Sequence, residues 1–193
     1  MENFYPVIAY FLGSIPFGLI LSHLFGDGKI MEKGSRNIGA TNAMRTQGKV
    51  IGVSTFLLDF SKGFVACFFL KTESESLNLL ILAAPVIGHM FSIWLKFRGG
   101  KGIATYFGVL AALNPLVCFG TVLVWRVMFF ITKTSAAAGL LSVTSSLVIF
   151  NHARISLCLD FVNHMYVLMA LVVLIFIKHH ENIKRFIKNE QQT

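Results

Sequence analysis

The chain contains 193 residues, enough for a single domain. Apolar residues make up 55% of it, charged residues only 13%, and its mean hydropathy is +0.70. Soluble domains carry about 25% charged residues, and a soluble fold of this size has too small an interior for 19 phenylalanines and the many aliphatic residues. The composition excludes a disordered chain and predicts an all-α integral membrane protein, with one membrane-embedded domain over residues 1–193.

Six apolar segments follow one another along the chain. The first begins after only three residues, with no basic leader and no obvious small-residue cleavage site, so we interpret it as a retained helix. A helix needs about 20 residues to cross the hydrocarbon core of a bilayer. The segments cover residues 4–25, 50–70, 77–95, 103–131, 135–150 and 161–177.

The fourth segment is longer than one crossing requires and contains Asn114-Pro115. Proline has no amide hydrogen and disfavours helical geometry in the residue before it, so we expect two helices that meet here. The first of them, residues 103–113, is about 16 Å long and too short to span alone. The sequence therefore predicts about seven transmembrane or partly spanning helices.

The distribution of basic residues favours this count, because Lys and Arg collect on the cytoplasmic side of membrane proteins. With the split and an external N-terminus, only Lys71 and Arg154 face outward, Lys62 and Arg126 lie within the bilayer, and the C-terminus is cytoplasmic. This arrangement accounts for the net charge of +8, so we expect no nucleic-acid partner. The basic residues predicted to face the cytoplasm are Lys29, Lys33, Arg36, Arg45, Lys49, Lys96, Arg98, Lys101, Lys133, Lys178, Lys184, Arg185 and Lys188.

Cysteine and carboxylate spacing gives no sign of a metal site. Cys67, Cys118 and Cys158 lie in or beside separate apolar segments, without C-x-x-C spacing. The sequence shows no cluster of carboxylates that would suit a divalent cation. We therefore expect neither a zinc site nor a disulfide framework, and no metal or other cofactor.

The longest polar stretch, residues 26–49, contains GSRNIGATN at 34–42, followed by Arg45. Glycines let the backbone turn several N–H groups toward one point, the hydroxyls and amides add neutral donors, and arginine supplies a fork that matches phosphate. This composition suits an anion cradle. A capped helix start after a glycine turn explains it equally well, and the stretch lacks the Gly-Lys-Ser/Thr ending of a Walker loop.

Three further polar features have a functional and a plainer interpretation. GGKG at 99–102 allows close backbone approach and presents the Lys101 ammonium, whereas Lys96 and Arg98 are interpreted as lipid-headgroup contacts. Asp59 and Lys62, three residues apart in an apolar segment, are expected to neutralise each other. The tail HHENIKR at 179–185 either binds phosphate or accepts a proton near the cytoplasmic face, or is a basic stop after a membrane helix.

Taken in order, five blocks of this chain resemble the PlsY family of bacterial acyl-phosphate:glycerol-3-phosphate acyltransferases. They are GSIPFG at 13–18, GSRNIGATN at 34–42 with the arginine that follows, LDFSKG at 58–63, GH at 88–89 with GGKG at 99–102, and HxxNI from 179. The resemblance extends over essentially the whole chain. It implies a seven-helix enzyme of the bacterial inner membrane that uses acyl phosphate and glycerol-3-phosphate, and membrane lipid as its surroundings.

The resemblance also implies the site residues. The positions that hold the phosphorylated substrates are Ser35, Arg45, Lys101, His179 and Asn182. The acyl-phosphate cradle and its neighbours are Gly34, Asn37, Ile38, Gly39, Ala40, Thr41, Asn42 and Gly100. The chain departs from the family pattern at Arg36, where glycine is usual, and at Ser92, where proline is usual. A turn with positive φ at residue 36 is therefore in question.

The sequence contains no His-x4-Asp pair, so it lacks the two residues of a His/Asp general-base mechanism. We hypothesise that the glycerol hydroxyl passes its proton to a phosphate oxygen of the donor or to His179. Two other functions fit a basic site among membrane helices. A transporter of an organic phosphate would bind the same ligand, and a structural scaffold would need none of the cationic residues.

Overall fold

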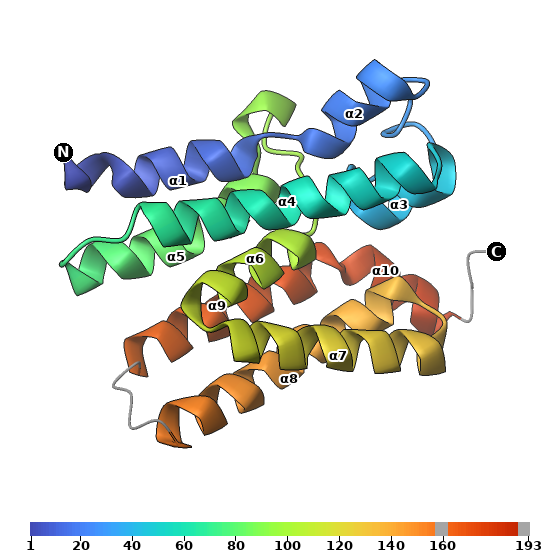
Figure 1. The fold of residues 1–193 in the computed structure, drawn as a ribbon. Coiled ribbons are helices and arrows are strands. Elements are labelled where there is room, and N and C mark those ends of the chain that lie inside the picture. Colours follow the sequence, from blue (N-terminus) through green and yellow to red (C-terminus); the bar gives the residue numbers. More distant parts are fainter. Residues whose placement is uncertain (157–161, 189–193) are drawn as a thin grey trace. The chain divides into compact units, whose positions relative to one another are not determined.

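The computed structural model describes residues 1–156 and 162–188, and within these ranges all regular structure is helical (Figure 1). Cys158 and Phe161, which the sequence analysis used, lie outside the described residues. Two single-turn 3₁₀ helices, η1 (Glu2–Phe4) and η2 (Ile93–Leu95), accompany the α-helices. The α-helices are α1 (Tyr5–Ser14), α2 (Phe17–Phe25), α3 (Ala40–Thr46), α4 (Lys49–Phe69), α5 (Glu75–Met90), α6 (Ile103–Leu113), α7 (Pro115–Thr132), α8 (Ser135–Ser156), α9 (Val162–Lys178) and α10 (His180–Ile187).

Prolines break two of the expected apolar segments. The split at Asn114-Pro115 is confirmed: Asn114 is extended, and its side-chain oxygen accepts hydrogen bonds from the amides of Leu116 and Val117, so it caps α7 while proline begins that helix. The sequence analysis missed the break at Ile15-Pro16, which divides the first segment into α1 and α2. Together these two helices still form one candidate span, Glu2–Phe25.

Five stretches of the described residues are long and apolar enough to cross a membrane: Glu2–Phe25, Lys49–Phe69, Glu75–Leu95, Pro115–Thr132 and Ser135–Ser156. The bent pair of α9 and α10 raises the number to six if it forms one span. As expected, α6 is apolar but shorter than these spans. The all-helical membrane class is therefore confirmed, whereas the count of seven and the external N-terminus stay predictions.

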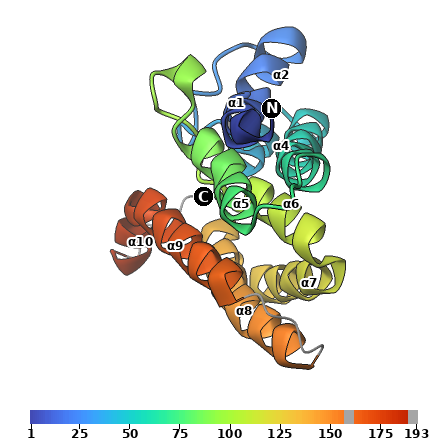
Figure 2. The same cartoon turned by 90° about the vertical axis from the view of Figure 1, so that its left-hand side faces the viewer.

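Reciprocal glycine contacts hold two helix pairs together. A Cβ added at Gly13 of α1 would collide with the Pro85 backbone of α5, and one at Gly88 of α5 would collide with the Tyr10 backbone of α1. Gly63 of α4 meets the backbone of α6 in the same way, and Gly108 of α6 meets that of α4. Without a hydrophobic force between helices in lipid, close backbone approach at small residues is what joins them. Figure 2 shows α1 and α4 nearly end-on, beside α5 and α6.

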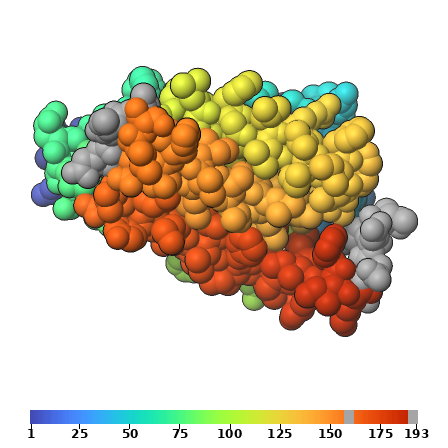
Figure 3. Space-filling model, turned by 90° about the horizontal axis from the view of Figure 1, so that it is seen from below, coloured from blue at the N-terminus to red at the C-terminus, as the bar shows by residue number. Residues whose placement is uncertain are grey.

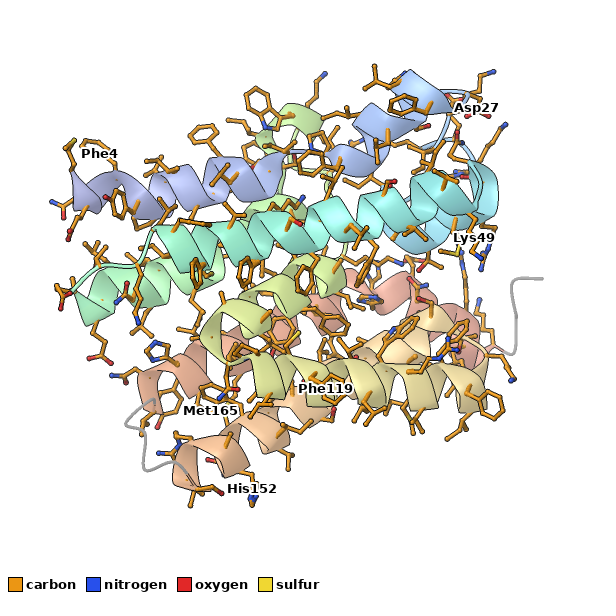
Figure 4. All side chains as sticks on the ribbon, viewed as in Figure 1. Phe4, Asp27, Lys49, Phe119, His152 and Met165 are labelled. Carbon is orange, nitrogen blue, oxygen red and sulfur yellow. The ribbon has the colours of Figure 1, made fainter. Side chains whose placement is uncertain are left out.

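The chain forms two compact units, residues 1–118 and 119–193. In the first unit, Phe4 lies at one end, whereas Asp27 and Lys49 both lie at the other (Figure 4). In the second unit, α8 and α9 pack side by side (Figure 3). The single domain expected over residues 1–193 stays a prediction.

Candidate functional site

The loop between α2 and α3, here called the first loop (residues 26–39), is organised around the side chain of Asn42. The side-chain amide nitrogen of Asn42 donates hydrogen bonds of 2.8–3.2 Å to the carbonyl oxygens of Ile30, Lys33 and Asn37. Its amide oxygen accepts a hydrogen bond from the backbone N–H of Ser35 at 2.9 Å. Asn42 is buried. The side chain of this predicted cradle residue therefore holds the loop.

Two local turns shape the GSRNIGATN stretch. Gly34 and Arg36 both have positive φ, 59° and 55°. The positive-φ turn at residue 36 is therefore present, although arginine occupies the position. Asn37 then accepts a hydrogen bond from the amide of Gly39 through its side-chain oxygen, in an Asx turn. α3 begins directly afterwards, with Gly39 as an N-cap residue that has no side chain to satisfy the first amides. The plainer interpretation was right that a helix starts here, but no side chain of the N-cap residue caps it.

Arg45 and the start of the first loop lie at the C-terminal end of α3. Arg45 is exposed in the last turn, and the Gln47 side chain just beyond accepts a hydrogen bond from the amide of Asp27. Asp27 also pairs with Lys33 within the loop. The hydrogen bond from the Lys33 ammonium holds the pKa of the exposed Asp27 carboxyl well below its usual range, and the backbone N–H of Lys29 adds to the effect. The first loop is thus fastened at both ends of α3.

The second loop, residues 91–102, connects α5 to α6 and carries Lys101. The amides of Gly99 and Gly100 donate to the carbonyl oxygens of Met90 and His89, at 3.2 and 2.9 Å. A Cβ at Gly100 would collide with the His89 ring, which explains why this position needs glycine. Lys101 is half-buried, immediately before Gly102, the N-cap residue of α6, which has a φ of 89°.

The second loop is also fastened to the break between α1 and α2. The Ser92 hydroxyl donates to the carbonyl oxygen of Ser14 at 2.6 Å, and the Tyr10 hydroxyl donates to that of Phe91 at 2.7 Å. At Ser92, where the resemblance implies proline, this chain has a side-chain hydrogen bond that proline could not donate. The role of His89 and Ser92 was missed by the sequence analysis, since nothing in the spacing shows which helix they contact.

His179 and Asn182 belong to the second unit, where α9 gives way to α10. His179 is buried and serves as the N-cap residue of α10, and its Nδ1 lies 2.7 Å from the carbonyl oxygen of Ile175. Because a carbonyl can only accept, Nδ1 carries the hydrogen, and Nε2 is the nitrogen that can take a proton or accept a bond. Asn182 lies in the first turn of α10 and is half-buried.

The chemistry of these residues suits an anion. In the described ranges, no three His, Cys, Asp or Glu side chains are placed to hold a metal ion. The first unit has glycine-rich backbone in two fastened loops, with Lys101 on the second loop and Arg45 in the last turn of α3. Cations and backbone N–H groups of this kind stabilise phosphate oxygens.

Comparison with known proteins identifies a family. The family model described as glycerol-3-phosphate acyltransferase matches residues 4–189. Proteins of that name from Pelagibacter ubique and from Wolbachia pipientis of Culex pipiens are 40% and 38% identical to the chain, which they match over 96% of its length and over 93% and 95% of their own. Among solved structures, the glycerol 3-phosphate form of PlsY, described as an integral membrane glycerol 3-phosphate acyltransferase, superposes with a TM-score of 0.91. It is 33% identical, with coverage of 99% of this chain and 94% of that one.

Proposed function

This chain belongs to the glycerol-3-phosphate acyltransferase family, and from that premise we propose that it transfers a fatty acyl group from acyl phosphate to the 1-hydroxyl of glycerol-3-phosphate. The products are lysophosphatidic acid and inorganic phosphate. The observation that carries the proposal is the family match across residues 4–189. The solved PlsY structures, described as glycerol 3-phosphate and lysophosphatidic acid forms, support the acceptor and the product.

The enzyme's main tasks in this reaction are to orient the two reactants and to offset the charge of their phosphate groups. Acyl phosphate is a mixed anhydride with a good leaving group, so the hydroxyl oxygen forms a bond to the acyl carbon while the bond from that carbon to the phosphate oxygen breaks. Both reactants are oxyanions, and holding them together replaces a bimolecular encounter by an oriented one. Arg45 and Lys101 would offset their charge, and the backbone of residues 37–42 with the Ser35 hydroxyl would hold the phosphate.

The hydroxyl proton needs an acceptor, and we propose a donor phosphate oxygen or Nε2 of His179. The hydrogen bond from Nδ1 of His179 to Ile175 supports the second option, because it sets the tautomer that leaves Nε2 as the basic nitrogen. His179→Gln distinguishes the two. If turnover loses its dependence on pH near neutrality, His179 is the acceptor, whereas a raised KM with an unchanged pH profile means that it only binds substrate.

We propose that the site faces the cytoplasm from the bacterial inner membrane, with the N-terminus outside. Support comes from the positions of the basic residues in the sequence, which favour that side for both loops and for the tail. Single cysteines introduced at Arg45, Lys101 and His179 test this in intact cells. All three should be protected from an impermeant thiol reagent until the membrane is opened. Labelling of any one from outside would contradict the orientation.

The decisive assay uses the purified chain in lipid vesicles with acyl phosphate and glycerol-3-phosphate, and detects lysophosphatidic acid. A transporter would form no product. Arg45→Ala and Lys101→Ala should each lower kcat/KM at least about a hundredfold, because each removes a charge-assisted contact to an oxyanion. Lys49→Ala and Arg98→Ala, exposed cations close to each in sequence, are the matched controls. Full activity in both test variants would show that neither cation is needed for the reaction, and a parent chain that forms no product would leave the transporter and the scaffold. Dependence on added metal would contradict a reaction without cofactors.

A further inference from the structure

A buried ionic cluster lies in the first unit, apart from the residues assigned to substrates. Asp59 and Lys62 belong to α4 and His89 to α5, and the exposed fractions of the three are only 1%, 5% and 4%. Lys62 Nζ lies 2.8 Å from Asp59 Oδ1, and His89 Nδ1 lies 3.5 Å from the same oxygen. Ionisable groups inside a membrane segment are costly, and they usually mark function. Mutual neutralisation explains the pair, but it does not explain the contacts that the cluster makes outside it.

One contact reaches the break between α1 and α2. Lys62 Nζ donates a hydrogen bond of 2.8 Å to the carbonyl oxygen of Ile15, and the ammonium lies 5.8 Å from the centre of the Phe17 ring. The same carbonyl accepts the amide of Phe17 at 3.1 Å, so the ammonium is its second donor at a break within a membrane span. Three residues later, a Cβ on Gly18 would collide with the carbonyl oxygen of Ile38, so α2 rests directly on the first loop. Lys62 therefore holds the helix break from which α2 continues to its contact with the first loop.

The other contact reaches the second loop through His89. His89 Nδ1 is the ring nitrogen near Asp59, and the ring edge that carries Nε2 lies against Gly100, where an added Cβ would collide with it. The carbonyl oxygen of His89 accepts the amide of Gly100 at 2.9 Å. The position of the His89 ring thus sets where Gly100 lies, and Lys101 is the next residue.

We propose that Asp59, Lys62 and His89 form a brace that sets the spacing between the first and second loops, and that they are positioning residues for binding of the two phosphorylated reactants. This inference rests on the proposed function for the identity of the reactants. Asp59 is the centre of the brace, with Lys62 directed to the first loop and His89 to the second. The phosphate cradle and the Lys101 ammonium are then held at one separation, as an oriented reaction requires.

The test removes both charges together, because removal of one would leave the other buried and uncompensated and would strongly destabilise the chain. The double variant Asp59→Asn with Lys62→Met keeps the approximate volumes but loses the bond to Ile15. We expect it to purify as a folded protein with the thermal midpoint of the parent, and to show a KM for glycerol-3-phosphate raised at least about tenfold. Lys71→Met with Glu73→Gln removes two exposed opposite charges just after α4, away from both loops in the sequence, and is the matched control.

The spacing itself is measured without the reaction. Nitroxide labels on cysteines at Glu32 and Arg98, both exposed, report the distance between the two loops in a background without the native cysteines. The parent should give one narrow distance distribution, and the double variant and His89→Phe should broaden or shift it. An unchanged distribution with unchanged KM would overturn the brace. If the parent makes no lysophosphatidic acid, the proposed function fails, and the label distances still decide whether the brace exists.

Discussion

Replacing Asn42 by alanine should release the first loop without unfolding the helices. The amide has two hydrogens for three carbonyl partners and one oxygen bonded to the Ser35 amide, so about three hydrogen bonds are lost. At about 1 kcal/mol for each bond, the loop loses about 3 kcal/mol of local stability. Because the loop is a surface segment that can open locally, the loss appears there first.

Hydrogen exchange read out by mass spectrometry in detergent measures this. A change of about 3 kcal/mol corresponds to roughly a hundredfold faster exchange of the loop amides, with exchange in α4 unchanged. Asn42→Asp should speed exchange of the loop amides more than alanine does. Aspartate keeps the acceptor for the Ser35 amide, but it places a second oxygen opposite three carbonyl oxygens. Thr46→Val, which removes the hydroxyl bond to the Asn42 carbonyl on the same helix, is the control. Undiminished protection in Asn42→Ala would refute the assignment of this side chain as the organiser of the loop.

Three smaller predictions follow from single contacts. Arg36→Gly should raise thermal stability slightly, by up to about 1 kcal/mol, because glycine adopts positive φ without the steric cost that arginine meets; a lower melting temperature would show that the arginine side chain compensates. Asn114→Ala should cost about 1 kcal/mol through loss of the α7 cap, measured by thermal denaturation against Asn114→Ser, which retains a cap. The pKa of Asp27, read by carboxyl NMR, should rise when Lys33 is changed to Met. Since the folded pKa is lowered, this pair supports the loop above about pH 4 and ceases to do so as the pH falls through the folded pKa, and high salt should weaken it.

The helical class and the break at Asn114-Pro115 could be predicted because lipid requires long apolar helices and proline has a local effect. The break at Ile15-Pro16 obeys the same rule but was missed, since the apolar segment there is no longer than a normal span. Pro85 shows why the rule alone does not suffice, because it lies inside α5 without ending that helix.

The candidate site was predictable where its chemistry is local. Glycine-rich turns with a nearby cation indicate anion binding from local sequence alone. The positive φ of residue 36 is also local, and Arg36 adopts it. The side-chain role of Asn42 and the contact of His89 with Gly100 depend on chain segments that meet only in the folded molecule. From their spacing, Asp59 and Lys62 could be predicted only to neutralise each other. The hydrogen bond from Lys62 to Ile15 could not be predicted, because it joins residues 47 positions apart.

The glycine contacts between α1 and α5, and between α4 and α6, have a dynamic consequence. Proteins that undergo shear motion slide helices past each other by small rotamer changes in the side chains between them. Where backbone meets backbone there are no rotamers to change, so each of these helix pairs resists sliding. If the chain carries out the proposed reaction, its acyl donor and its lipid product must therefore enter and leave by displacement of connecting segments rather than by repacking of these two helix contacts.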